Sequence, residues 1–362
     1  MGNQILTVVL PCYNERENVE ELVSGLHQAD TQGQIKRIIY VDDDSTDGTS
    51  EYIKNNIYPL DVMCLLRIGR QGLSSAVVEG MLLADTPYVA VMDADGQHLP
   101  VDLMRMLKIA THESQQLVIG SRFKDEKSIE THVGLRAVLS RFGNSLANHV
   151  LRRKLSDPLT GFFLIERSLF IGIANKVRGA GFKILVDIIY NLRDKNIRIT
   201  ETQIQFKERI HGESKLDSGV MIEFADQMIG LFLGKFYPEK FMGFLMVGLV
   251  GMSVHFTILW TLLFPMAINF NQAQTFATLT AMVTNYVLNN FLTFRRNRLK
   301  GFEWIKGLFY FIAVCSLGAM ANVGIASYIY KMENMWWLSG LAGIVVGTVF
   351  NFTLSKYFVW KK

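Results

Sequence analysis

The sequence predicts an α/β domain with a mainly parallel sheet, followed by an all-α domain of four transmembrane helices. Strand-like apolar runs alternate with helical patterns in the first part of the chain. Most charged residues precede Lys240, and long apolar stretches follow it. The cysteines, Cys12, Cys64 and Cys315, are far apart and lack metal-ligand spacing, which indicates free thiols in a reducing compartment.

Five strands and four helices are expected in the first domain. Because ligands of such sheets bind beyond the carboxyl ends of the strands, the residues after each strand form the candidate site. The expected strands are 6–10, 37–41, 62–66, 89–92 and 117–119, and the expected helices are 17–29, 47–56, 72–84 and 101–112.

Two carboxylates, Asp93 and Asp95, follow the fourth expected strand, and Gln97 comes two residues later. Carboxylate and amide oxygens suit a hard cation, Mg²⁺ or Mn²⁺, that is shared with substrate phosphates. Such a metal would neutralise a leaving diphosphate. Acidic turn residues that cap the next helix are a commoner cause of the same pattern, so the assignment depends on its neighbours.

Asp42 and Asp43 end the second expected strand and should point into the same site. They are expected to bond a nucleotide base or ribose, and the alternative is a turn in which Ser45 or Thr46 caps the next helix. The first strand is not followed by GxGxxG, which argues against a dinucleotide-binding domain. A diphosphate would then be held by metal and basic side chains.

The second half of the chain is expected to span a membrane four times, because each span needs about 20 mainly apolar residues. Lysines and arginines precede the first span, fill the loop between the second and third spans, and follow the fourth span. By the positive-inside rule this predicts that both chain ends are cytoplasmic. The N-terminus has no secretory signal pattern. We therefore expect a multi-pass protein of the cell membrane, with spans at about 241–264, 273–294, 307–330 and 336–358.

The boundaries expected for the chain are 1–216 for the first domain, 217–238 for a connecting segment and 239–362 for the membrane domain. The connecting segment mixes apolar and charged residues. It is either an amphipathic helix on the membrane surface or a packing helix of the first domain.

The segments that begin at Asn285 and Asn351 resemble each other and end in aromatic and then basic residues. One interpretation is a duplicated helical hairpin whose copies are related by an axis along the membrane normal. The other is the common chemistry of helix ends at a membrane interface. The sequence leaves both open.

With these residues in place, the chain resembles family 2 inverting glycosyltransferases of the GT-A fold. More narrowly it resembles dolichyl- or polyprenyl-phosphate sugar synthases, which include GtrB-like enzymes, and its tail resembles the four-helix GtrA-like membrane domain. The resemblance covers about residues 6–216 in order. Its motifs are Pro11–Glu15, Val41–Asp43, Arg67 with Gly72–Ala76, Asp93–His98, Gly120–Arg122, Arg136, Ser140, Asp157–Phe162 and Arg209 with Gly212–Lys215.

The resemblance implies roles for most of the candidate residues. Asp93, Asp95 and Gln97 match a site for Mg²⁺ or Mn²⁺. Arg122, Arg136 and Ser140 match residues that bind the lipid phosphate. The nucleotide-sugar would contact Pro11, Tyr13, Glu15, Val41, Asp43, Asp93, Arg209 and Lys215.

The expected reaction is inverting transfer of mannose from GDP-mannose, or of glucose from UDP-glucose, to a polyprenyl or dolichyl phosphate. The acceptor phosphate has a second pKa near 6, so it is largely ionised at pH 7 and needs little help from a base. Catalysis is therefore assigned to placement and charge, through Asp95 and Arg122. Asp157 is a further candidate that would bond sugar hydroxyls or tune the acceptor, and its alternative is an Asp-Pro turn.

The expected partners are the donor, the lipid acceptor and membrane lipids. A net charge of +4 gives no indication of nucleic-acid binding, and a homo-oligomer is left open. One alternative function is a processive polysaccharide synthase, but the QxxRW motif typical of that class is not found. Another is translocation of a lipid-linked sugar by the membrane domain, which could also act only as an anchor.

Overall fold

The computed structural model describes residues 3–69, 72–123, 143–145, 147–177, 183–205, 207, 226–231, 237, 240–333 and 336–360. By its internal contacts the chain divides into two compact units. The first unit is Met1–Leu216 with Gln227–Gly234, and the second unit is Asp217–Asp226 with Lys235–Lys362.

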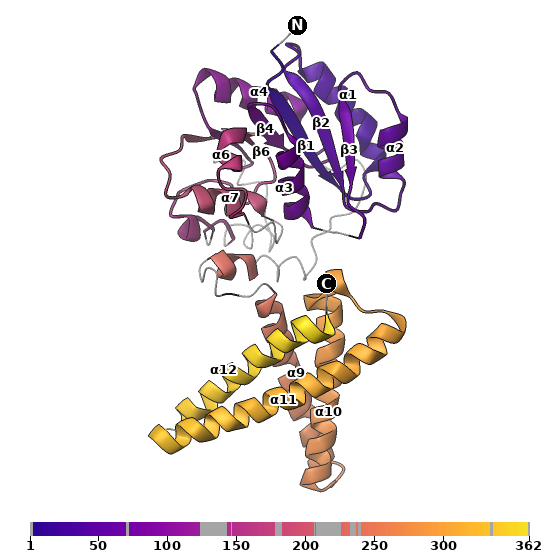
Figure 1. Ribbon diagram of the computed structural model, residues 1–362, viewed down its shortest axis with the longest axis vertical. Helices are drawn as coiled ribbons and strands as arrows, with labels where there is room; N and C mark the ends of the chain where they lie inside the picture. Colours follow the sequence, from indigo (N-terminus) through magenta and orange to yellow (C-terminus); the bar gives the residue numbers. More distant parts are fainter. Residues whose placement is uncertain are drawn as a thin grey trace. The chain divides into compact units, whose positions relative to one another are not determined.

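The first unit is built around a seven-stranded sheet of order β3-β2-β1-β4-β6-β5-β7, of which Figure 1 labels β1, β2, β3, β4 and β6. Neighbouring strands are parallel, except that β6 runs antiparallel to both β4 and β5. The predicted mainly parallel α/β sheet is confirmed. The strands are β1 (Leu6–Cys12), β2 (Ile35–Asp42), β3 (Val62–Leu66), β4 (Tyr88–Val91), β5 (Leu117–Ser121), β6 (Phe163–Glu166) and β7 (Ile199–Gln203).

The helices of the first unit largely follow the expected ranges, and α6 and α7 are additions. Pro100 lies in the first turn of α4, where a missing N–H is no loss. The cap expected at Ser45 or Thr46 is wrong, because α2 begins later, after Gly48 with φ 82°. The helical segments are η1 (Arg16–Asn18), α1 (Val19–Ala29), α2 (Thr49–Asn55), α3 (Leu73–Leu83), α4 (Pro100–His112), α6 (Arg167–Ile171) and α7 (Ile184–Leu192).

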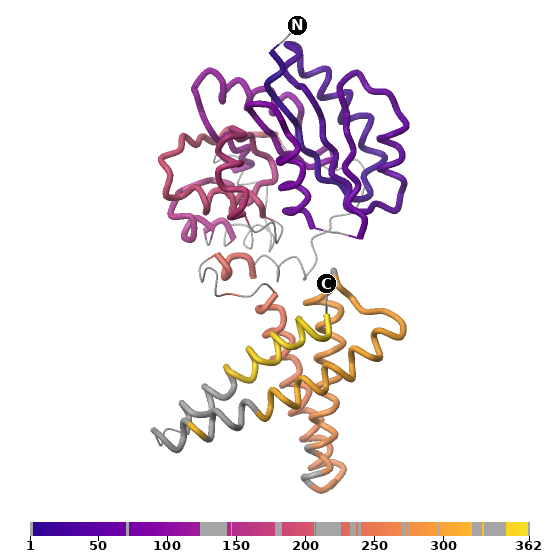
Figure 2. Tube along the Cα trace, in the orientation of Figure 1, coloured from indigo at the N-terminus to yellow at the C-terminus, as the bar shows by residue number. Residues whose placement is uncertain are grey.

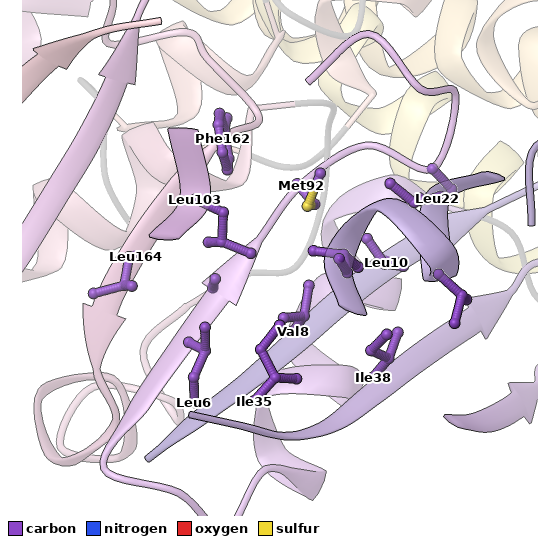
Figure 3. Packing of buried hydrophobic residues seen from close by; sticks show 14 of the residues in the cluster. Leu6, Val8, Leu10, Leu22, Ile35, Ile38, Met92, Leu103, Phe162 and Leu164 are labelled. Atoms are coloured by element: carbon purple, nitrogen blue, oxygen red, sulfur yellow. The ribbon is translucent and has the colours of Figure 1, made fainter. Parts of the chain in front are cut away.

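A buried apolar cluster joins one face of the sheet to α1 and α4 (Figure 3). Alternate residues of β1 point into it, as the two-residue period of a strand requires, and Leu22 of α1 and Leu103 of α4 meet them. The side chains labelled from β1 are Leu6, Val8 and Leu10.

The opposite face of the sheet is covered by α3, which approaches the strands closely at Gly80. A Cβ atom added there would lie 2.4 Å from Val9 Cγ1 and 2.9 Å from Val41 Cγ2. The missing side chain therefore lets α3 lie directly on β1 and β2. Because helices cover both faces of the sheet, a ligand is expected beyond the carboxyl ends of its strands.

The second unit consists of long helices, and α10 and α12 each end in a π-helical turn, Asn289–Thr293 and Ser355–Val359. Within the described residues, Phe241–Leu263 and Gly301–Met320 are the helical stretches long and apolar enough to cross a membrane. The spans expected at 273–294 and 336–358 are also helical, but their crossing stays a prediction. The helices are α9 (Phe241–Leu263), α10 (Phe270–Leu288), α11 (Gly301–Glu333) and α12 (Trp336–Leu354).

The second unit contains two helical hairpins, α9–α10 and α11–α12 (Figure 2). In each hairpin an asparagine of the second helix packs closely against a glycine of the first. Asn285 of α10 lies over Gly251 of α9, where an added Cβ would be 2.0 Å from the asparagine Oδ1. Asn351 of α12 lies over Gly318 of α11 in the same way, at 1.7 Å. The asparagines are 66 positions apart and the glycines 67.

Aromatic contacts between the hairpins repeat the same relation. Phe352 packs edge-on against Phe244 with ring centroids 5.4 Å apart. Their counterparts one repeat away, Tyr286 and Phe311, pack at 5.7 Å. Two further counterparts, Phe294 and Trp360, stack on each other at 4.3 Å with an interplanar angle of 7°. Reciprocal contacts of this kind are what a two-fold relation produces, so the geometry favours a duplicated hairpin.

We expect Gly251→Ala and Gly318→Ala to destabilise the second unit by about 1–3 kcal/mol each, because the added methyl group overpacks the asparagine contact. The matched control is Gly248→Ala, on the same helix as Gly251, where an added Cβ meets nothing within 4 Å. The midpoint of thermal unfolding in detergent would fall for the first two variants only. Equal midpoints for all three variants would contradict the close packing. Asn285→Ala should restore the thermal midpoint of Gly251→Ala, because it removes the side chain that the added methyl group would meet.

Candidate active site

The carboxyl ends of β1, β2, β3, β4, β5 and β7 lie at one edge of the sheet, because β6 alone runs the other way. Phe163, the first residue of β6, pairs with Val91 of β4 and Ile119 of β5. The loop that enters β6 therefore lies beside the residues that follow β4 and β5. The predicted gathering of polar residues at one sheet edge follows from this topology.

The Asp93 carboxylate lies at this edge, against the loop that enters β6. A Cβ atom added to Gly161 would be 3.1 Å from its Oδ1 and 3.3 Å from its Oδ2. The Asp93 side chain is 39% exposed, whereas Asp95 is buried and its Oδ1 accepts a hydrogen bond from the Gln97 N–H at 3.2 Å. One carboxylate thus faces outwards and the other shapes the loop.

His98 fixes the loop that carries Asp93 and Asp95 from the protein interior. Its ring is buried and stacks on Phe162 with centroids 4.6 Å apart. Its Nδ1 accepts the main-chain N–H of Asp93 at 3.2 Å, which requires an unprotonated Nδ1. Burial lowers the pKa of His98, although the charges of Asp93 and Asp95 oppose the shift. A neutral histidine therefore supports the carboxylate loop.

Gln97 is joined to the chain beyond β7 by two hydrogen bonds. Its main-chain carbonyl oxygen accepts the Lys207 N–H at 3.0 Å, and its side-chain Nε2 donates to the Lys207 main-chain carbonyl at 3.0 Å. The side-chain amide nitrogen of Gln97 is thereby directed at Lys207, so the side-chain amide oxygen points away from Lys207. That oxygen is the atom that the sequence assigns to a metal.

Arg122 is held by the buried carboxylate of Asp157. Its Nε donates to Oδ2 at 2.8 Å and its Nη2 to Oδ1 at 3.2 Å, a two-bond geometry that fixes the guanidinium plane. Burial works to lower the pKa of Arg122, but the bond to Asp157 and its charge outweigh it and raise the pKa. The Arg122 side chain is still 31% exposed at the sheet edge.

The strand β7 holds the same loop through Glu201. Its carboxylate accepts the N–H of Ser156 at 2.9 Å and the N–H of Asp157 at 3.3 Å. The Ser156 hydroxyl also lies 2.6 Å from the hydroxyl of Ser121, at the end of β5. Two strands, β5 and β7, thus fix the position of the loop that carries Asp157.

Lys183 is a cation near this site that the sequence analysis missed. Its Nζ donates to the Leu159 carbonyl at 2.9 Å. Burial, followed by the charge of Arg122, lowers its pKa, and the charges of Asp93 and Asp157 oppose this shift. Its place directly before the apolar helix α7 was the only local signal that it lies near the interior.

Asp43 is paired with Arg67, a fully buried cation at the end of β3. The Asp43 carboxylate also accepts the Gly72 N–H at 2.6 Å, and Arg67 Nη2 donates to the Ser75 hydroxyl at 2.6 Å. This network ties the ends of β2 and β3 to the start of α3. The nucleotide role of Asp43 stays a prediction beside this structural one.

Asp42 forms the turn that was its alternative interpretation. Its Oδ1 accepts the Ser45 N–H at 3.0 Å. Burial raises the pKa of Asp42, and the hydrogen bonds from Ser45 oppose the shift. This carboxylate therefore shapes the loop after β2.

The residues after β1 and β2 are bonded to each other. Asn14 has φ 56°, a left-handed conformation that asparagine tolerates. Its Oδ1 accepts the Thr46 N–H at 2.8 Å, and its N–H donates to the Ser45 hydroxyl at 2.8 Å. Pro11 and Val41 are buried register partners, and the Val41 side chain faces Gly80. Val41 can therefore meet a nucleotide only through its main chain.

Comparison with known proteins identifies both parts of the chain. Residues 7–173 match the model described as glycosyl transferase family 2, and residues 243–360 match the GtrA/DPMS transmembrane domain. A protein of Mycosarcoma maydis named dolichol-phosphate mannosyltransferase is 31% identical over 64% of this chain and 80% of its own length. The chain belongs to the dolichol-phosphate mannosyltransferase family.

Other members and neighbours extend this comparison. The Pyrococcus furiosus dolichol-phosphate mannosyltransferase is 29% identical over 98% of this chain and 99% of its own length. Among solved structures, glucosyl-3-phosphoglycerate synthase of Mycobacterium tuberculosis is 18% identical over 64% of this chain and 79% of its own, with a TM-score of 0.46. By the two family models, this member of the mannosyltransferase family is a glycosyltransferase with a GtrA/DPMS transmembrane domain, and its sheet is the mainly parallel one that the GT-A fold predicts.

Several predicted site residues of this family member lie outside the described residues. They are Arg136 and Ser140, assigned to the lipid phosphate, and Arg209 and Lys215, assigned to the donor. Most of the connecting segment 217–238 also lies outside them. The described residues bring Asp93, Asp95, Arg122 and Asp157 to one edge of the sheet. Asp93 contacts the loop that enters β6 at Gly161, and Asp157 of the same loop binds Arg122.

We expect Asp157→Ala to destabilise the protein by about 2–3 kcal/mol, because it removes the hydrogen bonds that join the partly exposed guanidinium of Arg122 to a buried carboxylate. The matched control is Asp85→Ala, which removes an exposed pair with Lys36 and should cost no more than about 1 kcal/mol. Denaturant unfolding of the two variants measures the difference. A cost for Asp157→Ala as small as that of the control would mean that the pair does not hold the edge together.

Proposed function

We propose that this chain transfers mannose from GDP-mannose to a polyprenyl or dolichyl phosphate and inverts the anomeric carbon to give a β-linked product. The observation that carries the proposal is that Asp93, Asp95 and Arg122 lie at the end of β4 and β5, where Asp93 and Arg122 contact the same loop. The relatives named dolichol-phosphate mannosyltransferase favour mannose over glucose, and hence GDP-mannose over UDP-glucose.

A divalent cation, Mg²⁺ or Mn²⁺, fits the oxygen donors of Asp93, Asp95 and Gln97. The part of the chain that the structure describes holds no group of three or more His, Cys, Asp or Glu side chains suited to a metal. One or two carboxylates are enough for a cation that shares substrate phosphates. When bound, such a cation would neutralise the charge of the departing diphosphate. Asp95, whose position the Gln97 N–H fixes, is proposed as the main ligand.

Arg122 is proposed to bind the acceptor phosphate. Two anions must approach each other in this reaction, and a guanidinium can bind two phosphate oxygens at once. Because Asp157 already fixes the plane of Arg122, little reorganisation is needed when the acceptor binds. Asp157 then acts through Arg122 as a positioning residue. Arg136 and Ser140 are proposed as further phosphate ligands.

The donor nucleotide is proposed to lie beyond the ends of β1 and β2. Tyr13 and Glu15 are partly buried there, and the bonded loops after the two strands would form the floor of the site. Asp43 would contact the nucleotide while it keeps Arg67 in place. The remaining proposed donor contacts are Pro11, Val41, Asp93, Arg209 and Lys215.

The membrane domain is proposed to keep the acceptor's polar end near the catalytic domain, because a polyprenyl chain is confined to the bilayer. We retain the layout of 1–216 for the catalytic domain, 217–238 for the connecting segment and 239–362 for the membrane domain. The positive charges that flank the helices support four spans with both chain ends cytoplasmic.

Asp95→Ala should abolish transfer of labelled mannose into the organic-extractable lipid fraction, because it removes a metal ligand. Purified protein would be incubated with Mg²⁺ or Mn²⁺, a short polyprenyl phosphate and labelled GDP-mannose, with labelled UDP-glucose in parallel. The control is Asp61→Ala, an exposed aspartate paired with Arg37. Wild-type turnover by Asp95→Ala would refute the metal role, and label from UDP-glucose alone would refute the choice of donor.

Gly161→Ala should lower kcat about tenfold or more while the fold is kept, because its methyl group would displace the Asp93 carboxylate. Gly172→Ala is the matched control, since its added Cβ would meet its neighbours at ordinary distances of 3.5 Å and more. The measurements are kcat and the thermal midpoint of both variants. An unchanged kcat for Gly161→Ala would show that the contact of Asp93 with this loop does not matter for transfer.

A further inference from the structure

We propose that the first unit carries a second anion site, which binds the phosphate headgroup of an anionic membrane lipid. The site is a cavity of about 220 Å³. Its lining combines basic, aromatic and aliphatic side chains: His149, Val150, Arg152, Tyr190, Arg193 and Leu231. None of these residues has a role in the transfer reaction proposed above.

The basic turn on one side of the cavity has a fixed conformation. The Asn148 side chain closes it, because its Nδ2 donates to the Leu155 carbonyl at 2.8 Å and its Oδ1 accepts the Leu155 N–H at 3.0 Å. Within this turn Arg152 has φ 53°, an uncommon conformation for a residue other than glycine. Arg152 is exposed and lines the cavity, and the exposed Lys154 lies two residues further along the same turn.

Arg193 supplies the second guanidinium. It lies over the ring of Tyr190, 3.9 Å from the ring centroid, which holds it at the cavity wall. Its neighbour Asp194 approaches its Nε at 3.6 Å but is 90% exposed, so this pair is weak. Lys195 adds a further exposed cation beside it. The charge around the cavity is therefore positive and suits a phosphate diester.

The aliphatic part of the cavity favours a lipid over a free phosphate. Val150 and Leu231 are both buried, and an inorganic ion would gain nothing from them. The helical residues 226–231 are held in place by Gln227, whose side chain accepts the Lys183 N–H at 3.3 Å and donates to the Lys183 carbonyl at 2.9 Å. A headgroup phosphate on the arginines would leave its glycerol and acyl carbons for this wall.

The covalent chain also limits how far the cavity can be from a membrane. Ten residues lead from Leu231 to Phe241, the first residue of α9. An extended chain of that length spans no more than about 35 Å, whatever the arrangement of the two units. Basic clusters directly beside a membrane segment attract anionic lipids. The tether therefore keeps the cavity within this distance of the start of α9, and a lipid headgroup is the phosphate that we assign to it.

The test is a binding titration of the full chain in detergent micelles with short-chain phosphatidylglycerol, followed by native mass spectrometry. We expect saturable binding that is about tenfold or more tighter than that of phosphatidylcholine or inorganic phosphate. Arg152→Gln with Arg193→Gln should weaken it by about tenfold or more, whereas Lys36→Gln with Arg37→Gln, equal in charge change, should not. The charge-keeping pair Arg152→Lys with Arg193→Lys should retain binding that exceeds the Gln pair.

Three results would overturn the proposal. The first is equal binding of phosphatidylglycerol by the wild type and the Gln pair when both show the same thermal midpoint. The second is equal affinity for inorganic phosphate, which would mean a site for free anions. The third is displacement of phosphatidylglycerol by polyprenyl phosphate, which would place the acceptor here. If the Gln pair fails to fold, Arg193→Gln alone is compared with Arg37→Gln alone.

Discussion

The ion pair between Arg122 and Asp157 is the interaction on which the geometry of the site depends. It joins the end of β5 to the loop that enters β6, and Glu201 of β7 holds the same loop from the other side. The Asp157 carboxylate is fully buried, so it is stable only when its hydrogen bonds are made, and its Oδ2 also accepts the main-chain N–H of Arg122 at 3.4 Å. The reversal of β6 matters for the same reason, because it brings this loop beside Asp93.

The sequence was most informative where a buried strand ends. Asp93, Asp95 and Arg122 follow apolar runs, so their common edge could be predicted from the rule for parallel sheets. The strand β7 was missed because polar residues alternate along it. The strand β6 was missed because it runs directly into α6 at Arg167, with no turn residue between them. Partnerships across the fold, such as Arg67 with Asp43 or Lys183 with Leu159, leave no local pattern in a sequence.

The polar residues of the second expected span illustrate a different limit. Asn290 joins distant parts of the second unit, since its Oδ1 accepts hydrogen bonds from the Leu299 N–H at 2.9 Å and the Trp360 Nε1–H at 3.0 Å. From composition alone, such residues only lowered the apolar character of the segment. The hydrogen bond between Asn290 and Trp360 also links the two hairpins. The sequence alone left the duplication of the hairpin as one of two interpretations.

The duplicated hairpin has a consequence for how this membrane unit can change. Two identical hairpins in a symmetric dimer would carry every substitution on both sides of the axis at once. Here both copies belong to one chain, so equivalent positions can hold different residues. Tyr286 of the first hairpin is equivalent to Phe352 of the second, and Asn289 is equivalent to Ser355. Each half can therefore acquire its own surface while the shared aromatic contacts keep the halves together.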